Sequence, residues 1–256
     1  MIFIAEPYRR ILREIGFNGE MIFTSPAIKP WRRLKDRENC TWDVASPAGT
    51  IRLHVKRFPF IRSSVPAEDE AKGYGLLHDR GIAAAVVAAW GVLDDGRSFI
   101  AVEDLAGFTP ADKLIESGLP FDRLLIPTAD LTGRLHSAGL HHRDLYLCHF
   151  LARCEDSRSA DLRLIDAARV RRLPGLLTRR RWIVKDLAQF WYSTTQLVIT
   201  DSQRDAWLGR YCEQTRMGQL GPLKKSILRK SAAIAAHDKK LRRREPNRNV
   251  SIPKLM

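Results

Sequence analysis

The sequence predicts an α+β chain of two lobes, for two reasons. Strand-like patterns concentrate in the first part of the chain, and helical periodicity prevails from Thr109 onward. Strands followed by helices are typical of an α+β architecture or of separate domains. With 256 residues, the chain can also bury a core without disulfide bonds. We place an N-lobe with an N-terminal helix at residues 1–105, a helical C-lobe at 106–221, and a basic C-terminal helix and tail at 222–256.

The first predicted elements are a short helix and a half-buried strand. Residues 8–17 place three aliphatic side chains on one helical face, and Gly16 ends the pattern. Residues 50–58 alternate apolar and polar side chains, as a strand with one buried face does. Lys56 is therefore expected on the polar face of that strand.

A helix and an antiparallel strand pair follow. Residues 66–80 begin with proline, carry three acids in the first turn, Glu70 among them, and stop before Gly81. These are start and stop signals of a helix. Two apolar runs, at 81–93 and 98–105, flank an Asp-Asp-Gly turn signal and predict the strand pair.

The second lobe is expected to be mainly helical, with one strand that ends on a carboxylate. The apolar run LRLI leads directly into Asp166 and predicts that strand. A basic stretch follows it, and a basic helix begins near Pro222 and frays into a tail rich in Pro and Asn. Amphipathic patterns predict helices at 109–117, 121–138, 184–197 and 202–216.

The charge of the chain predicts contact with something anionic. Lys and Arg number 43 against 29 Asp and Glu, a net charge of +14. This fits nucleic acid, a membrane surface, or a phosphorylated or acidic substrate, and charge alone does not choose among them. The excess is concentrated in residues 169–185, with seven cations and no acid, and in 222–256, with eleven cations and two acids.

Several other protein classes are excluded by the sequence. The four cysteines are scattered without metal-ligand spacing, which favours reduced thiols in a cytoplasmic protein. The histidines also lack the spacing of a zinc site. The apolar run after Met1 ends within a few residues, so no signal peptide is expected. The longest uncharged apolar stretch has 13 residues, fewer than the roughly 20 of a spanning helix.

The most informative segment for chemistry is His142-Arg143-Asp144, with His149 five residues after the aspartate. In a phosphotransfer site, the Asp of such a loop accepts the proton of the attacking hydroxyl. Asp166, at the end of its strand, offers an oxygen ligand for Mg²⁺ held against nucleotide phosphates. Lys56 on a strand and Glu70 on the following helix supply a cation and its partner. The four groups stand in the order found in kinases, and this order is far more specific than the HRD triplet alone.

In these residues the sequence resembles the lipopolysaccharide kinase (Kdo/WaaP) family, small bacterial members of the protein-kinase-like superfamily. The resemblance covers roughly residues 20–215, and HRDLYLCHF is its most specific part, because ordinary protein kinases have Asn where His149 stands. It implies a protein-kinase-like fold with a small β-rich N-lobe and a larger helical C-lobe. It also implies transfer of phosphate from ATP to a sugar hydroxyl, heptose or Kdo, in the inner core of lipopolysaccharide. The segments that carry it are LHSAGLHHRDLYLCHFLA, LRLIDAARVR, KDLAQFWYST and HVKRF.

The resemblance implies catalytic and metal-binding roles in the second lobe. Asp144 would orient and deprotonate the sugar hydroxyl, and Asp166 would ligate Mg²⁺. His149 stands where kinases use Asn for a second metal. Because imidazole suits Mg²⁺ poorly, we expect His149 to contact phosphate or Asp144. Asp186 would support the catalytic loop from the helix behind it.

It also implies a nucleotide site in the first lobe. Lys56 would bind the α- and β-phosphates of ATP, and Glu70 would pair with Lys56. The strand at Glu103 to Leu105 would lie against the adenine. The chain has no glycine-rich GxGxxG loop before Lys56, so side chains would have to cover the phosphates, and Arg37 is the candidate. Asp166 is followed by Ala-Ala rather than Phe-Gly, which argues against a phosphorylation-gated activation loop.

The expected partner is a lipopolysaccharide core or lipid A precursor at the cytoplasmic face of the inner membrane, with peripheral contact to the anionic lipid surface and no nucleic acid. Arg179, Arg180 and Arg181 follow Asp166 where kinases meet their acceptor, so we expect them to bind it. Two alternatives stay open. One is a kinase of similar fold that acts on another small molecule or on protein Ser or Tyr. The other is a non-catalytic basic module for nucleic acid or membranes.

Overall fold

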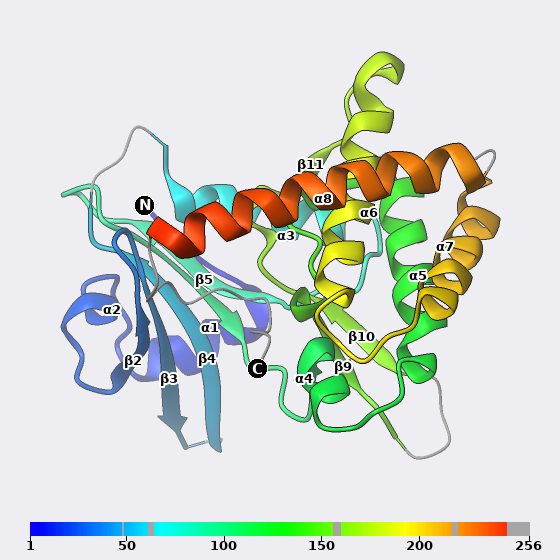
Figure 1. The fold of residues 1–256 in the computed structure, drawn as a ribbon. Coiled ribbons are helices and arrows are strands. Elements are labelled where there is room, and N and C mark those ends of the chain that lie inside the picture. The colour runs from blue at the N-terminus through cyan, green and yellow to red at the C-terminus, as the bar shows by residue number, and fades with distance from the viewer. Residues whose placement is uncertain (48, 61–63, 156–159, 217–219, 245–256) are drawn as a thin grey trace. The chain divides into compact units, whose positions relative to one another are not determined.

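The computed structural model describes residues 1–47, 49–60, 64–155, 160–216 and 220–244 (Figure 1). The chain divides into two units. Unit 1 comprises Met1–Gly75, Ala85–Ala106 and Ala167–Arg169, and unit 2 comprises Leu76–Ala84, Gly107–Asp166 and the described residues from Val170 onward. Unit 1 is rich in strands and unit 2 in helices, which confirms the predicted α+β class. The predicted lobe boundaries remain predictions.

Unit 1 is built on a six-stranded antiparallel sheet in the order β1-β5-β6-β4-β3-β2. The predicted strand pair around the Asp-Asp-Gly turn is confirmed as β5 and β6. The predicted strand with Lys56 is the central strand β4, where Lys56 lies opposite Ile100 of β6. The strands are β1 (Ile2–Ile4), β2 (Ile28–Arg33), β3 (Glu38–Ser46), β4 (Gly49–Phe58), β5 (Val87–Val92) and β6 (Ser98–Glu103).

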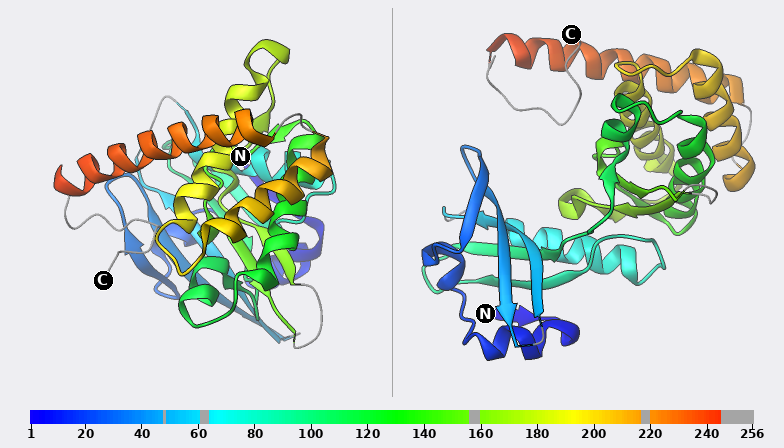
Figure 2. Two further views of the ribbon diagram at one scale, coloured as in Figure 1. Left: turned by 45° about the vertical axis from the view of Figure 1, so that its right-hand side comes forward. Right: turned by 90° about the horizontal axis from the view of Figure 1, so that it is seen from below.

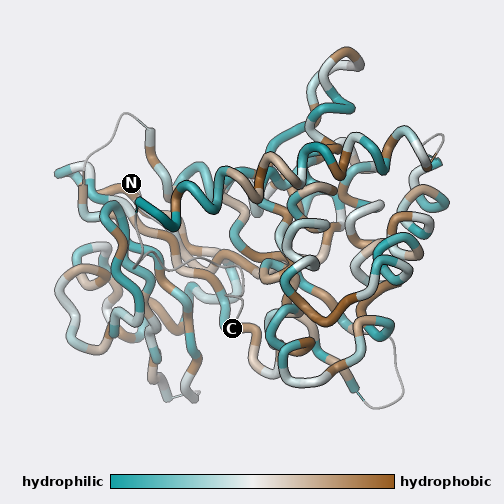
Figure 3. The backbone as a smooth tube through the Cα atoms, viewed as in Figure 1, coloured by the Kyte–Doolittle hydropathy of each residue, from teal (hydrophilic) through white to brown (hydrophobic). Residues whose placement is uncertain are grey.

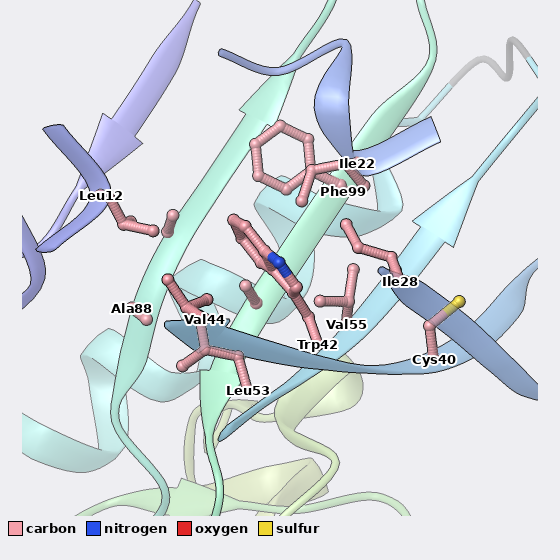
Figure 4. Close-up of a cluster of buried hydrophobic side chains, with 12 residues drawn as sticks. Leu12, Ile22, Ile28, Cys40, Trp42, Val44, Leu53, Val55, Ala88 and Phe99 are labelled. Carbon is pink, nitrogen blue, oxygen red and sulfur yellow. The ribbon is translucent and has the colours of Figure 1, made fainter. Parts of the chain in front are cut away.

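Two helices, α1 (Glu6–Glu14) and α2 (Met21–Thr24), contribute to a core on one face of this sheet. Figure 4 shows their side chains Leu12 and Ile22 together with Trp42 and Phe99 from the strands. Because strand side chains alternate between faces, the inward-facing Leu53 and Val55 of β4 leave Lys56 on the opposite face.

The helix α3 (Pro66–His78) agrees closely with the predicted helix at 66–80. Its residues up to Gly75 belong to unit 1. There the helix makes a very close approach to the backbone of Ala167: a Cβ on Gly73 would lie 1.9 Å from the Ala167 carbonyl oxygen. Only glycine fits this approach. Glu70, one turn earlier, lies on the same side of α3, because residues three apart share a helix face.

Unit 2 packs its helices around an aromatic core. Phe190 stacks on Trp207 with ring centroids 4.0 Å apart, and the Trp207 Nε1–H donates to Thr128 at 3.0 Å. The α7 helix begins with a capping box of Thr200 and Gln203. Figure 2 gives two further views, in which α8 crosses and contacts α6. The helices are α4 (Ala111–Glu116), α5 (Asp122–Ser137), α6 (Leu176–Thr194), α7 (Asp201–Thr215) and α8 (Leu220–Arg244).

Short strands connect these helices and flank the loops that carry His142-Arg143-Asp144 and Asp166. They form a three-stranded sheet in the order β10-β9-β7 and a pair β11-β8. The strand predicted to end on Asp166 is β10, which stops two residues before it. The strands are β7 (Thr109–Pro110), β8 (Leu140–His141), β9 (Phe150–Arg153), β10 (Asp161–Leu164) and β11 (Arg171–Arg172).

The main difference from the sequence prediction concerns α6. It was expected near 184–197 but begins at Leu176, so the predicted acceptor-binding arginines lie inside a helix. Leu and Arg are good helix formers, but consecutive arginines hide the apolar periodicity on which the prediction rested. The α8 helix confirms the predicted basic helix, whereas the tail at 245–256 lies outside the described residues.

Candidate active site

In unit 1, Lys56 and Glu70 form a close ion pair. The Lys56 Nζ donates to the Glu70 Oε1 at 2.7 Å, and the side chains are 22% and 2% exposed. Strand β4 supplies the lysine and helix α3 the glutamate. A nearly buried carboxylate fixes the direction of the ammonium group, whose further N–H donors can bind phosphate oxygens.

The other residues predicted for the nucleotide lie at a strand end and in a turn of the same sheet. The Glu103 carboxylate accepts hydrogen bonds from the backbone N–H of Val86 at 2.9 Å and from the Tyr8 hydroxyl at 3.5 Å. Burial and this carboxylate raise the pKa of Tyr8 to about 12. Leu105, just beyond β6, is half-buried. Arg37 lies in the turn between β2 and β3, where its Nε is buried with no hydrogen-bond partner among the described residues.

Sequence reasoning missed one residue beside Lys56. His54 lies two residues earlier on β4 and therefore on the same face of the sheet. Its Nε2 lies 2.7 Å from the Asp104 Oδ1. The strand alternation that placed Lys56 also places His54, and this is the signal that could have found it.

In unit 2, the HRD loop is held by the buried carboxylate of Asp186. This side chain, fully buried on α6, accepts hydrogen bonds from the backbone N–H groups of His142 at 2.6 Å and Arg143 at 2.8 Å. Burial alone would raise the pKa of Asp186, but the hydrogen bond from His136 and these N–H groups hold it below its usual value. The carboxylate therefore stays charged and fixes the loop, as the sequence predicts.

The loop backbone is strained where it passes Arg143. This residue has a φ of +69°, in the left-handed region that residues other than glycine rarely adopt. Besides the Asp186 contacts, the Lys185 Nζ donates to the Arg143 carbonyl oxygen at 2.7 Å. Such strain persists where surrounding contacts enforce it, and it is concentrated at functional sites.

Asp144 is oriented by Gln189, which lies on α6 together with Asp186. The Gln189 Nε2–H donates to the Asp144 Oδ1 at 3.3 Å, while the Gln189 Oε1 accepts from the backbone N–H of Leu145 at 3.3 Å. Lys185 and Gln189 were not predicted as site residues. Their signal is the helical spacing within KDLAQ, since residues three to four apart share a helix face.

His149 and Asp166 lie close to Asp144. The His149 Nδ1–H donates to the Asp144 backbone oxygen at 2.7 Å, and its Nε2 lies 3.7 Å from the Asp166 Oδ2. Burial opposes protonation of the ring, but Cys148, the Asp166 carboxylate and the Asp144 oxygen raise the pKa of His149 to about 10. The hydrogen bond from Nδ1 to the Asp144 backbone oxygen is in keeping with the expectation that His149 contacts phosphate or Asp144.

His142 anchors the segment that carries Asp166. Burial lowers the pKa of His142, so its ring is neutral, and its Nε2–H donates to the Ile165 oxygen at 3.2 Å. Asp166 itself has φ of +62°, and its side chain is 29% exposed. Asp166 thus combines a strained backbone with a partly accessible carboxylate.

Asp166 offers a single accessible carboxylate, which Mg²⁺ can use when nucleotide phosphates supply its other ligands. In the part of the chain that the structure describes, no group of three or more His, Cys, Asp and Glu could hold a metal alone. Mg²⁺ usually takes one or two carboxylates and completes its shell with phosphates and water. The partly accessible carboxylate of Asp166 fits that arrangement.

The three predicted acceptor-binding arginines differ in their surroundings. The Arg179 Nη2–H donates to the His136 backbone oxygen at 3.2 Å, so this half-buried side chain also links α6 to α5. Arg180 and Arg181 are exposed, and Arg181 lies beside Trp182. The structure thus brings together Asp144, His149, Asp166 and Asp186 in unit 2, and Lys56 with Glu70 in unit 1.

Comparison with known proteins identifies a family that this chain resembles in sequence. The model of the Lipopolysaccharide kinase (Kdo/WaaP) family matches residues 67–211. The lipopolysaccharide core heptose(I) kinase WaaP of Pseudomonas aeruginosa is 27% identical over 261 residues, covering 91% of each chain. The protein of the same description from Escherichia coli is 28% identical over 207 residues, 69% of this chain and 74% of the relative.

Among solved structures, the crystal structure of WbdD matches 80% of this chain and 50% of its own, with a TM-score of 0.47 and 15% identity. The family match spans more than half of the chain and includes Glu70, the HRD loop, Asp166 and Asp186. The chain therefore belongs to the lipopolysaccharide kinase (Kdo/WaaP) family and is an ATP-dependent phosphotransferase.

Proposed function

We propose that this protein transfers the γ-phosphoryl group of ATP to a sugar hydroxyl, heptose or Kdo, in the inner core of lipopolysaccharide. The observation that carries the proposal is the orientation of Asp144. Its carboxylate is positioned by Gln189 and lies in a loop fixed by Asp186, with His149 and Asp166 beside it. The relatives described as heptose(I) kinases favour heptose as the acceptor sugar.

In the proposed reaction, Asp144 acts as the catalytic base. The acceptor oxygen forms a bond to the γ-phosphorus while the bond between that phosphorus and the β,γ-bridging oxygen breaks. The hydroxyl proton passes to the Asp144 carboxylate, and ADP leaves. Because phosphoryl transfer needs mainly positioning and charge neutralisation, the fixed loop is as important as the carboxylate. Lys56, directed by Glu70, would bind the nucleotide phosphates.

Asp166 would hold Mg²⁺, which when bound neutralises charge on the transferred phosphoryl group. His149, hydrogen-bonded to the Asp144 carbonyl and with its Nε2 3.7 Å from the Asp166 Oδ2, would link the Asp166 carboxylate to the catalytic loop. In unit 1, Arg37 would lie over the nucleotide phosphates, and the strand end at Glu103 and Leu105 would lie against the adenine.

The basic surface of unit 2 suits a glycolipid acceptor presented at the anionic cytoplasmic face of the inner membrane. Helix α8 contacts α6 and buries Leu223 and Ile227, and much of the rest of the helix is hydrophilic (Figure 3). Exposed Lys and Arg near an anionic bilayer contribute about 1 kcal/mol each. No helix among the described residues has the length and apolar character to cross a membrane.

The test is phosphorylation of defined acceptors by the purified protein. Delipidated core oligosaccharides ending in unphosphorylated heptose or Kdo would be incubated with ATP and Mg²⁺, and the products identified by mass spectrometry. Phosphate is expected on a core sugar with the wild type. Asp144→Asn should abolish transfer and keep nucleotide binding, whereas Asp166→Asn should weaken binding of Mg²⁺ with nucleotide. Phosphate found only on a protein acceptor would refute the proposal.

A further inference from the structure

Three cations gather around one aromatic ring of unit 2, beside the catalytic loop. The Arg143 guanidinium carbon lies 4.7 Å from the centroid of the Trp182 ring, the Lys185 Nζ 5.7 Å and the Arg181 guanidinium carbon 5.8 Å. Significant cation–π contacts occur only about once per 70–80 residues in proteins. Three on a single ring, here named the Trp182 cluster, are an unusual concentration of positive charge.

The surroundings keep the Trp182 cluster positive. The His141 ring lies 4.9 Å from the Trp182 ring, and burial lowers the pKa of His141 to about 4, so it is neutral at physiological pH. Residues 169–185 contain seven Lys and Arg and no acid. The next acid, Asp186, is fully buried and accepts from the loop backbone. The stretch 169–185 therefore contributes cations to this part of unit 2 and no acids of its own.

The Trp182 cluster shares one rigid frame with Asp144. Trp182, Lys185 and Gln189 are spaced three and four apart on α6, so their side chains leave the same face of the helix. Lys185 donates to the Arg143 carbonyl oxygen, and Gln189 donates to the Asp144 carboxylate. Arg143 is also the residue directly before Asp144. Anything bound by the cluster is thus held at a set distance from the catalytic carboxylate.

We propose that Arg143, Arg181 and Lys185 bind an acidic group of the acceptor, a phosphate ester or a sugar carboxylate, and so place the neighbouring hydroxyl at Asp144. This inference rests on the proposed function, because it assigns the chemistry of that acceptor. It adds Arg143 and Lys185 to the predicted acceptor residue Arg181.

The chemistry of the cluster fits such a group. An arginine guanidinium forms paired hydrogen bonds to two oxygens of a carboxylate or phosphate, and a lysine ammonium adds a compact positive charge. The contacts with Trp182 hold the three cations around one ring before an anion binds. A neutral sugar would gain little from three cations, so the cluster discriminates acidic from neutral acceptors.

The kinetic test compares Arg143→Gln, Arg181→Gln and Lys185→Gln with wild type, varying acceptor and ATP separately. Arg134→Gln is the matched control, because Arg134 is an exposed arginine elsewhere in unit 2. Each cluster variant should raise KM for the acceptor about 10-fold, the loss typical of one charge-assisted hydrogen bond, with KM for ATP within about 2-fold. Arg181 is exposed, so its variant should fold even if the loop variant Arg143→Gln does not.

The same assay with altered acceptors identifies the acidic group. The acceptor is tested after removal of its phosphates and, separately, after reduction of its carboxyl groups. One of these two changes should raise the KM of the wild type for the acceptor to the value of the variants. If neither change affects the wild type, or if the variants raise KM for acceptor and ATP equally, the proposal is wrong and the cluster is structural.

A binding experiment separates failure of this inference from failure of the proposed function. Inorganic phosphate and acetate would be titrated into ¹⁵N-labelled protein, and the Trp182 indole N–H signal assigned with Trp182→Phe. Saturable shifts that are lost in Arg181→Gln are expected. If the wild type phosphorylates no core acceptor, the proposed function fails, and this titration alone decides the anion site. An unperturbed Trp182 signal would then overturn the anion site as well.

Discussion

Replacing Gly73 with alanine tests whether the close approach of α3 to Ala167 sets the geometry of the nucleotide-binding pair. The new Cβ would lie 1.9 Å from the Ala167 carbonyl oxygen, whereas real Cβ contacts essentially never fall below 3.0 Å. Either α3 or the segment 167–169 must therefore move by at least about 1.1 Å. Neither neighbour is the flexible end of a side chain, so backbone has to shift.

The displacement acts on the Lys56–Glu70 pair, because Glu70 lies one turn from Gly73 on α3. A rigid shift of α3 away from the contact can lengthen the 2.7 Å hydrogen bond to about 3.8 Å, beyond hydrogen-bonding range. Misplacement of a positioning group by about 1 Å can reduce turnover by up to about 100-fold. We expect weaker ATP binding and turnover reduced by one to two orders of magnitude.

The assay measures the dissociation constant for ATP, turnover and Tm for Gly73→Ala beside Gly75→Ala. Gly75 is the matched control, because it lies in the same helix and a Cβ there would meet no atom within 4 Å. Alanine at 75 should keep activity and stabilise the helix by up to about 1 kcal/mol. Wild-type ATP affinity and turnover in Gly73→Ala would show that the contact has no effect on the pair.

Three further outcomes follow from the described contacts. Asp186→Asn should destabilise the protein by about 3–5 kcal/mol at neutral pH. Because the pKa of Asp186 is lowered in the folded protein, its contribution to stability is present above the unfolded pKa near 4 and is lost as the pH falls. Urea unfolding curves of wild type and variant should therefore converge as the pH is lowered. Lys56→Met should raise KM for ATP at least about 10-fold and leave KM for the acceptor unchanged, and equal changes in both would contradict its assignment. Arg179→Gln should lower stability by about 1 kcal/mol in thermal melts, because its hydrogen bond to the His136 carbonyl is lost; a Tm equal to that of Arg181→Gln would argue against this contact.

Much of the fold and site was predictable, because the decisive signals are local. Strand alternation placed Lys56, first-turn acids and a proline placed the helix with Glu70, and the HRD spacing placed Asp144 near His149. These features depend on a few neighbouring residues in the sequence. The two-residue and three-residue strands, in contrast, exist only because a distant partner pairs with them, as β1 does with β5.

The residues that surround Asp144 were harder to predict. Gln189 and Lys185 contact the loop across more than 40 positions of sequence, and nothing near the HRD triplet indicates them. The Trp182 cluster also depends on the early start of α6, which the run of arginines obscured. Contacts between helix and loop are tertiary, and a single sequence holds only the helical spacing as a trace of them.

The left-handed backbone at Arg143 places stability and function in opposition at one residue. Glycine would adopt a φ of +69° without the penalty of about 1–2 kcal/mol that a side chain brings there. Under the proposed role of Arg143, binding of the acceptor by its guanidinium offsets this cost to the fold. Selection for heat resistance alone would favour replacing it, and thermostabilised variants of this enzyme should be checked first for discrimination between acidic and neutral acceptors.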